Sequence, residues 1–248
     1  MSLFFKNRFR SGSPPPPFCS AVVVAAGRSI RMGSERDKIF ELLDGMPVLV
    51  HTLLAFEQCP LVHEIIVVTR EDSLVAASQL CHTYGISKAT HVVIGGETRV
   101  ASVFSGLLSV SAKAKLIAIH DGARPFATKE LIASTVQAAS LSGAAAPAVP
   151  LQDTIKSVSN GVFIETPDRA SFRAVQTPQV FDAALIKGAI QKALEERWPI
   201  TDDCSAVERI GMQVSLVEGL PENMKLTTPS DFAMAEGICQ WRREKMFS

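Results

Sequence analysis

Short runs of apolar and β-branched residues alternate along the chain with longer segments in which apolar residues recur at helical spacing. This alternation is typical of a mostly parallel sheet that is covered by helices on both faces. The runs that predict strands are Ala21–Ala25, Glu64–Thr69, His91–Ile94, Lys115–His120, Ala144–Val149 and Gln213–Val217. The segments that predict amphipathic helices are Val48–Phe56, Ser73–His82, Val100–Val110, Lys129–Ser140, Ala183–Glu195 and Ser230–Arg243. The pattern therefore predicts a doubly wound, mostly parallel, Rossmann-like α/β fold.

One stretch, from about residue 151 to 175, departs from this alternation. It is polar and turn-prone, and Asn160-Gly161 is a strong signal for a two-residue hairpin turn. A β-hairpin at this point would protrude from the sheet, and it could not bury its own alternating apolar side chains. We expect this arm to pack on another subunit, which predicts a homodimer.

The first 20 residues contain basic but no acidic side chains and a run of four prolines. This composition predicts a disordered tail over residues 1–20, followed by one domain over residues 21–248 that includes the arm. No apolar stretch of the signal-peptide type follows the basic residues, and no run reaches the roughly 18 apolar residues of a membrane span. We therefore expect a cytoplasmic protein that does not enter a membrane.

Lys plus Arg and Asp plus Glu number 25 each, so the chain carries no net charge. Without a basic excess it is not expected to bind nucleic acid, and any anionic ligand must be held by a local arrangement of charges. The five cysteines are widely spaced and form no C-x-x-C pair, which favours reduced, buried thiols. These features favour a small-molecule partner.

The loops that follow the strands are the places to look for a site, because ligands of open α/β sheets bind outside the carboxyl ends of the strands. The loop after the first predicted strand, AAGRSIRMGSERDK (25–38), has small residues followed by several basic ones. Small residues let backbone N–H groups approach a phosphate, and cations neutralise the charge of a triphosphate. The spacing matches neither the P-loop nor the G-x-G-x-x-G pattern. The loop therefore predicts a phosphate site of another kind.

Two further strand ends carry candidate chemistry. One strand ends in GGETRVAS (95–102), where the glycine pair permits close backbone approach and Ser102 can reach a base or a phosphate. Another ends in HDGARPF (120–126), where an unpaired Asp121 carboxylate beside an anionic substrate would serve as a ligand for Mg²⁺. Arg124 could orient Asp121 or contact the substrate.

In order and spacing, these segments resemble the 2-C-methyl-D-erythritol 4-phosphate cytidylyltransferases, within the wider family of sugar-phosphate cytidylyltransferases. The resemblance includes QDTIK (152–156), PDRASFRAVQTPQVF (167–181), TDD (201–203) and NMKLT (223–227), and it runs from about Val22 to Glu236. It implies a nucleotidyltransferase domain that transfers CMP from CTP to 2-C-methyl-D-erythritol 4-phosphate. The products would be 4-diphosphocytidyl-2-C-methyl-D-erythritol and pyrophosphate, in non-mevalonate isoprenoid biosynthesis.

The resemblance also implies roles for individual residues. Arg31 and Lys38 would be the catalytic cations that stabilise the pentacoordinate α-phosphate. The residues implied to bind the nucleotide are Ala25, Ala26, Gly27, Gly96, Glu97, Ser102, Asp121, Gly122 and Lys225. Asp121 would also hold Mg²⁺ with the triphosphate, and Lys225 would bridge CTP and the acceptor. The residues implied to bind the acceptor are Arg124 and Thr201, together with Thr154, Arg169 and Thr177 from the arm of the partner subunit.

The chain departs from the family pattern at four positions. Ser29 stands where the family usually has a second glycine, and Ile30 where it often has a basic residue. Asp37 stands where proline commonly precedes the lysine, and Glu97 replaces a frequent aspartate. Ser29 and Asp37 are expected to alter the conformation of the first loop or to slow its closure.

The implied reaction is an in-line displacement of pyrophosphate by the acceptor phosphate. Such a reaction needs positioning and charge neutralisation more than a strong base, because the nucleophile is already anionic. The histidines are therefore not required. His120 alone has a candidate role, because it precedes Asp121.

Three other functions remain open at this point. A cytidylyltransferase for ribitol 5-phosphate or another polyol phosphate would share most of these loops, although DGARP and QDTIK favour the erythritol phosphate. A sugar-1-phosphate nucleotidyltransferase that uses UTP or dTTP is disfavoured by HDGARP and TPQVF. A non-catalytic, nucleotide-binding regulatory protein is disfavoured by the joint presence of Arg31, Lys38, Asp121 and Lys225.

Overall fold

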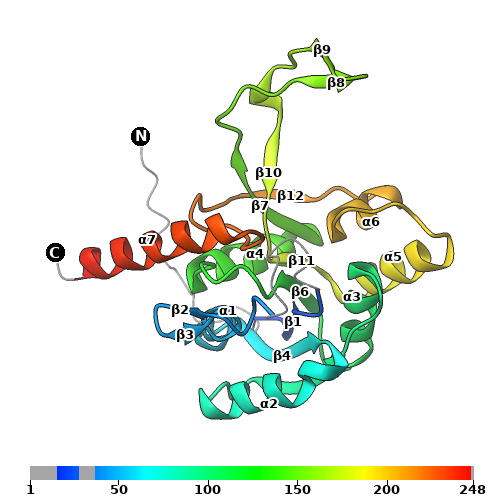
Figure 1. The fold of residues 1–248 in the computed structure, drawn as a ribbon. Coiled ribbons are helices and arrows are strands. Elements are labelled where there is room, and N and C mark those ends of the chain that lie inside the picture. The colour runs from blue at the N-terminus through cyan, green and yellow to red at the C-terminus, as the bar shows by residue number, and fades with distance from the viewer. Residues whose placement is uncertain (1–15, 28–36, 247–248) are drawn as a thin grey trace, which may run out of the picture.

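The computed structural model describes residues 16–27 and 37–246 of the 248-residue chain. Its centre is an eight-stranded sheet with helices on both faces (Figure 1). The strands that run parallel to one another are β1 (Cys19–Val24), β4 (Val62–Thr69), β5 (Ala89–Ile94), β6 (Leu116–Asp121), β7 (Ala144–Pro150) and β12 (Ser215–Glu218). The helices are α1 (Val48–Gln58), α2 (Leu74–Thr83), α3 (Arg99–Leu108), α4 (Lys129–Ser142), α5 (Ala183–Glu195), α6 (Asp203–Arg209) and α7 (Pro229–Met246). The predicted doubly wound, mostly parallel α/β fold is confirmed.

One strand, built in two pieces, runs against the others. β10 (Arg173–Val175) pairs with the end of β7, and β11 (Gln179–Asp182) pairs with β6 and with the start of β7. The sheet order is therefore β12, β7, the β10 and β11 pieces, β6, β1, β4 and β5. The sequence pattern did not predict these pieces, because runs of three or four residues are too short to show a period. The break between them brings residue 177 to the carboxyl end of β6.

Alternation along β1 divides its side chains between the two faces of the sheet. Ala21 and Val23 belong to the core that α1, α2 and α4 cover, whereas Val22 belongs to the core beneath α3, α5 and α6. Because both faces are covered, the strands are apolar almost throughout and are easily recognised in the sequence. All five cysteines are free and buried, as predicted.

All the strands and helices that the pattern predicts have counterparts in the structure, and their ends differ by no more than three residues. β1 begins at Cys19, so the last two residues of the predicted 1–20 tail belong to the sheet instead. The backbone N–H groups of Lys115 and Leu116 also donate to the carbonyl of Phe18, which fixes the start of β1 beside β6. Residues 1–15 of the predicted tail lie outside the described residues.

Helix α6 was not predicted, because its seven residues span only two turns. It begins with a capping box, in which the Asp202 carboxylate accepts from the backbone N–H of Ser205. The Asp202 side chain and the residues around it could have signalled a helix start. The consequence for the site is that Thr201 and Asp202 are held in a defined turn.

The C-terminal helix α7 packs on a short hairpin of β2 (Leu42–Leu43) and β3 (Met46–Pro47). A small apolar cluster joins them, and Leu226 lies within it, fully buried. The backbone N–H of Leu226 donates to the carbonyl of Ala123, so the segment before α7 is pinned to the end of β6. Among the described helices, none combines the length and the apolar character needed to cross a membrane.

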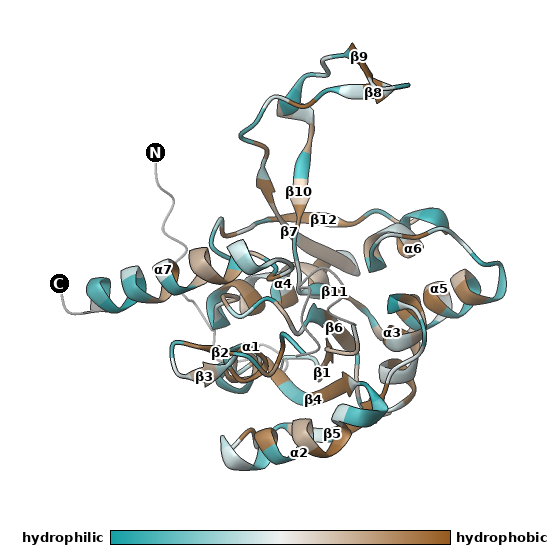
Figure 2. Cartoon of the chain, in the orientation of Figure 1, coloured by the Kyte–Doolittle hydropathy of each residue, from teal (hydrophilic) through white to brown (hydrophobic). Residues whose placement is uncertain are grey.

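The predicted hairpin arm is present and projects away from the rest of the chain (Figure 1). β8 (Ser157–Ser159) and β9 (Val162–Glu165) pair across Asn160 and Gly161, whose φ angles are 49° and 78°. Positive φ at both positions is what a tight hairpin turn of this kind requires. The arm carries exposed apolar side chains, with Phe163 75% exposed, and β9 stands out as hydrophobic in Figure 2.

Candidate active site

The carboxyl ends of β1, β5 and β6 border a first hollow of about 910 Å³. The loop after β1, the loop after β5 and the segment around Lys225 form its walls. Most of the residues that the sequence predicted to bind the nucleotide or to be catalytic line it, namely Ala25, Ala26, Gly27, Lys38, Gly96, Glu97, Ser102, Asp121 and Lys225. A hollow therefore lies at the strand ends where the sequence predicted a site.

A second hollow of about 570 Å³ adjoins the first and lies over β7, β10 and the start of α6. Three residues that the sequence predicted to bind the acceptor line it: Arg124, Thr177 and Thr201. Arg173 on β10 and Gln179 on β11 also line it, and neither was predicted. The second hollow thus combines groups from the end of β6, from the broken strand and from the α6 turn.

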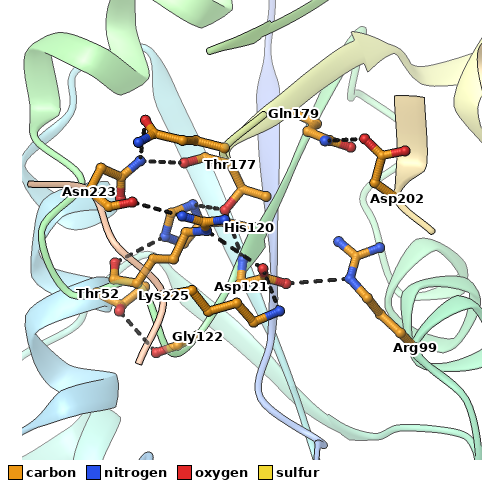
Figure 3. Close-up of polar contacts among 12 residues, drawn as sticks. Thr52, Arg99, His120, Asp121, Gly122, Thr177, Gln179, Asp202, Asn223 and Lys225 are labelled. Atoms are coloured by element: carbon orange, nitrogen blue, oxygen red, sulfur yellow. Dashed lines mark hydrogen bonds and ion pairs between the residues drawn. The ribbon is translucent and has the colours of Figure 1, made fainter. Parts of the chain in front are cut away.

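Three charged side chains line both hollows: Arg99, Asp121 and Lys225. They come from three separate parts of the sequence, the first residue of α3, the end of β6 and the segment before α7. Figure 3 shows the side chains of Arg99 and Lys225 pointing toward the Asp121 carboxylate. We call these three side chains the junction, because ligands in the two hollows would meet there.

Asp121 is the acidic centre of the junction and is only 7% exposed. Its carboxylate lies 2.8 Å from Lys225 Nζ, 3.4 Å from Arg99 Nε and 3.6 Å from Arg124 Nε. Burial by itself would raise the pKa of Asp121, but these three cations together lower that pKa well below its ordinary value. The prediction of an unpaired carboxylate was wrong, because tertiary contacts supply partners that adjacent sequence does not show.

His120 and Thr177 form a buried hydrogen-bonded chain behind Asp121. His120 Nε2 lies 3.2 Å from the carbonyl oxygen of Arg124, and because a carbonyl only accepts, this nitrogen carries the proton. His120 Nδ1 then accepts from the Thr177 hydroxyl at 2.9 Å, and Thr177 Oγ1 accepts from the backbone N–H of Asp121 at 3.2 Å. The chain fixes both the tautomer of His120 and the end of β6.

Thr177 was predicted to reach a neighbouring site from the arm, and this prediction was wrong. Thr177 is 4% exposed, follows the arm in sequence, and lies in the body of its own chain between β10 and β11. The buried side chain of Asn223 donates to the Thr177 carbonyl at 2.9 Å and so holds this corner against the segment that carries Lys225. The corner thus connects the broken strand to the junction.

The neutral state of His120 makes the stability of the fold dependent on pH. Burial lowers the pKa of His120 from its ordinary value of 6.5 to about 4. The unfolded chain therefore binds a proton at His120 that the folded chain excludes. The free energy of unfolding is not reduced by this proton above pH 6.5, and it falls as the pH falls from 6.5 toward 4. We expect the free energy of unfolding to fall by about 2 kcal/mol between pH 7.5 and pH 5.

Urea unfolding at the two pH values, on the original chain and on His120→Gln, measures this loss. The variant should show a clearly smaller pH dependence, because glutamine does not titrate. His82→Gln on α2 is the matched control, since this exposed ring is solvated in both states. An unchanged pH dependence in His120→Gln would contradict the assignment.

The loop after β5 is preorganised by its own small residues. A Cβ at Gly96 would lie 2.4 Å from the Cβ of Ala101, so no other residue fits this conformation. Ser102 Oγ accepts from the backbone N–H of Gly96 at 3.2 Å, and Thr98 caps α3. Ser102 therefore braces the loop that faces the first hollow.

Lys38 enters the first hollow beside an ion pair. Asp37 Oδ2 lies 3.0 Å from Arg70 Nη1, and Arg70 also lines this hollow. Burial raises the pKa of Asp37, although Arg70 opposes the shift. Asp37, at a position where the family pattern commonly has proline, thus ties the Lys38 segment to the residue after β4.

Among the described residues, three that the sequence predicted for the site line neither hollow. Gly122 lies behind Ala25, where an added Cβ would be 3.0 Å from the Ala25 Cβ. Thr154 and Arg169 lie exposed on the arm. Arg31 lies outside the described residues, as do Ser29 and Ile30.

The chain is similar to known proteins over most of its length. A family model described as 2-C-methyl-D-erythritol 4-phosphate cytidylyltransferase matches residues 19–240. A protein of this name from Caldanaerobacter subterraneus subsp. tengcongensis is 46% identical over 219 residues, which is 88% of this chain and 96% of that protein. Another from Halalkalibacterium halodurans has the same identity over the same share of each chain.

Solved structures of such proteins share the fold. The 4-diphosphocytidyl-2C-methyl-D-erythritol synthase of Anaerococcus prevotii superposes with a TM-score of 0.80 at 31% identity, over 91% of this chain and 97% of that one. The 2-C-methyl-D-erythritol 4-phosphate cytidylyltransferase of Thermus thermophilus gives a TM-score of 0.74 at 32% identity, over 88% and 98% of the two chains. The likeness thus extends over almost the whole of the described fold.

Proposed function

Because the chain belongs to the 2-C-methyl-D-erythritol 4-phosphate cytidylyltransferase family, we propose that its two hollows are the halves of one active site. The activity is that of the family, the transfer of a cytidylyl group in isoprenoid biosynthesis. We assign CTP to the first hollow and 2-C-methyl-D-erythritol 4-phosphate to the second. The observation that carries this assignment is the junction, where Arg99, Asp121 and Lys225 line both hollows.

In the first hollow, the small residues after β1 leave room for a triphosphate against the backbone. Ala25, Ala26 and Gly27 follow β1 directly. The N–H of Ala25 donates to the Val68 carbonyl at 2.7 Å, whereas the N–H groups of Ala26 and Gly27 can approach phosphate oxygens because no bulky side chain intervenes. The loop around Gly96 and Glu97, braced by Ser102, would hold the cytosine. This pose points the α-phosphate toward the junction.

In the second hollow, the acceptor phosphate would lie near Arg124 and Lys225 and its hydroxyls near Thr201. One of its phosphate oxygens attacks the α-phosphorus of CTP and forms the new P–O bond. The bond from the α-phosphorus to the bridging oxygen then breaks, and pyrophosphate leaves. Lys38 and Arg31 stabilise the charge that accumulates on the α-phosphate in between.

No side-chain base is needed for this displacement. The acceptor phosphate is anionic at neutral pH, and both nitrogens of His120 are already engaged in hydrogen bonds to Arg124 and Thr177. His120 therefore acts by holding the end of β6 in place. The work of the site is positioning and neutralisation of charge.

We propose that a divalent cation, Mg²⁺, accompanies CTP at the junction. The described residues contain no cluster of three acidic, His or Cys side chains that could enclose a metal ion. Mg²⁺, however, is commonly held by one or two carboxylates together with substrate phosphates. Asp121 would be the protein ligand, with phosphate oxygens of CTP completing the set, and the ion would neutralise part of the triphosphate charge.

We also propose that the chain works as a homodimer in which the arm of one subunit completes the site of the other. The exposed apolar residues of the arm support this, since a protruding hairpin is marginally stable without a surface to cover it. Thr154 and Arg169 lie on the arm and are not among the residues that line the two hollows of their own chain, and we propose that they contact the acceptor of the partner subunit.

The experiment that tests the proposed function is pyrophosphate release from CTP and Mg²⁺, with the candidate acceptors offered separately. We expect release with 2-C-methyl-D-erythritol 4-phosphate and much slower release with ribitol 5-phosphate. UTP in place of CTP is the matched control for the nucleotide. Release with ribitol 5-phosphate alone would overturn the acceptor assignment, and no release with either acceptor would overturn the proposed function.

A further inference from the structure

Arg99 contacts two carboxylates, those of Asp203 and Asp121, which are far from it in the sequence. Its guanidinium binds Asp203 with both terminal nitrogens, Nη1 to Oδ1 at 3.0 Å and Nη2 to Oδ2 at 2.7 Å. Its Nε lies 3.4 Å from Asp121 Oδ1. The bidentate geometry fixes the plane of the guanidinium. Arg99 thus connects two carboxylates, Asp121 at the end of β6 and Asp203 at the start of α6.

Asp203 is the buried end of this connection. It is fully buried, and it is not among the described residues that line either hollow. Its backbone N–H donates to Gln179 Oε1 at 2.9 Å, and Gln179 Nε2 donates to Asp202 at 2.8 Å. The contacts therefore continue from α3 through Asp203 into the turn that presents Thr201.

We propose that Arg99 is a positioning residue that couples the two halves of the site. From the start of α3 it holds Asp121 directly, and through Asp203 it holds the turn that carries Thr201. The proposal rests on the proposed function and assigns to Arg99 a role that no nucleotide or acceptor contact requires. It also explains why the chain has an ion pair between Arg99 and the fully buried Asp203. A buried ion pair seldom stabilises a fold more than apolar residues of the same size would.

Two variants separate positioning from folding. Arg99→Lys keeps the positive charge but cannot make the bidentate contact together with the contact to Asp121. Asp203→Asn keeps the shape and removes the charge of a residue that touches neither hollow. We expect each to lower kcat by about 10- to 100-fold and to raise the KM of the acceptor, because a shift of about 1 Å in a reacting group has effects of this size. CTP affinity, measured by calorimetry without acceptor, should change less than threefold.

The double variant Arg99→Lys with Asp203→Asn supplies the decisive comparison. If the two residues act as a unit, the double variant should be no more than about threefold worse than the worse single variant. The matched control is Arg243→Lys, which alters an exposed Arg–Asp pair of 2.7 Å on α7 and should leave kcat and both KM values unchanged.

Thermal unfolding midpoints show whether each variant is folded. Near-original kcat and acceptor KM in folded Arg99→Lys would overturn the inference even if Asp203→Asn fails to fold. So would losses that multiply in the double variant, or a loss of CTP affinity as large as the loss of kcat. A failure of the proposed function is distinguishable, because the original chain would then release no pyrophosphate from CTP with either acceptor.

Discussion

Replacing Lys38 by alanine is expected to lower kcat by about 100- to 1000-fold while CTP affinity changes only a few-fold. Lys38 lines the first hollow, and in the proposed pose its ammonium group meets the α-phosphate of CTP. Negative charge on that group is greatest in the pentacoordinate state. An interaction that strengthens there reduces the barrier more than it strengthens substrate binding.

Single-turnover measurements with saturating CTP isolate this step from product release. Arg31→Ala should behave in the same way. Lys192→Ala removes an exposed lysine from α5 and should leave the rate unchanged, which makes it the matched control. Near-normal turnover in both Lys38→Ala and Arg31→Ala would contradict the proposed mechanism.

Replacing Arg169 by alanine is expected to lower kcat/KM for the acceptor on the order of 100-fold, because an arginine that binds a phosphate makes charge-assisted bonds. Arg169 is exposed on the arm, where its Nη1 donates to the Gln152 carbonyl. A mixture of two inactive variants, Lys38→Ala and Arg169→Ala, tests whether Arg169 contributes to the site of its own chain or to that of the partner subunit. In a Lys38→Ala and Arg169→Ala heterodimer, one site has both defects and the other has neither.

Random pairing of the two variants in equal amounts should therefore restore about a quarter of the original activity, since half of the dimers are mixed and each has one intact site. The two variants must be unfolded and refolded together, with each refolded alone as the control. No recovery in the mixture, from variants that both form dimers, would show that Arg169 serves its own chain and would refute the shared site.

Much of the fold was predictable from local sequence because the central strands are buried on both faces. β1 and β4 are apolar for most of their length, and that signal does not depend on knowing what lies beside them. The broken strand β10 and β11 lacked such a signal. Its pieces are short, and they form strands because neighbouring strands supply hydrogen-bond partners: β6 and β7 for β11, and β7 for β10.

The site was predictable to the extent that its residues stand at strand ends. Asp121 and the glycines after β5 could be assigned in this way, whereas the partners that set their properties could not. Arg99 binds Asp203 across 104 positions in the sequence. Nothing in either segment indicates the pairing, although a lone arginine after a glycine pair and an aspartate pair before a short helix were visible signals.

Thr177 is a second residue whose contacts could not be predicted from the sequence around it. It stands only two residues after the predicted end of the arm, and the resemblance to the family assigned it to the arm of the partner subunit. Hydrogen bonds to His120, Asp121 and Asn223 hold it in the body instead. Only the three-dimensional arrangement decides where the arm ends and the site begins.

That boundary has a consequence for inhibitors of the acceptor site. Arg173 and Val175 belong to the root of the arm, and they also form part of the wall of the second hollow. A compound wide enough to spread this wall would tilt the arm that leaves from it. In the proposed dimer, such a compound would reshape the neighbouring site as well, so that one bound molecule would disable two.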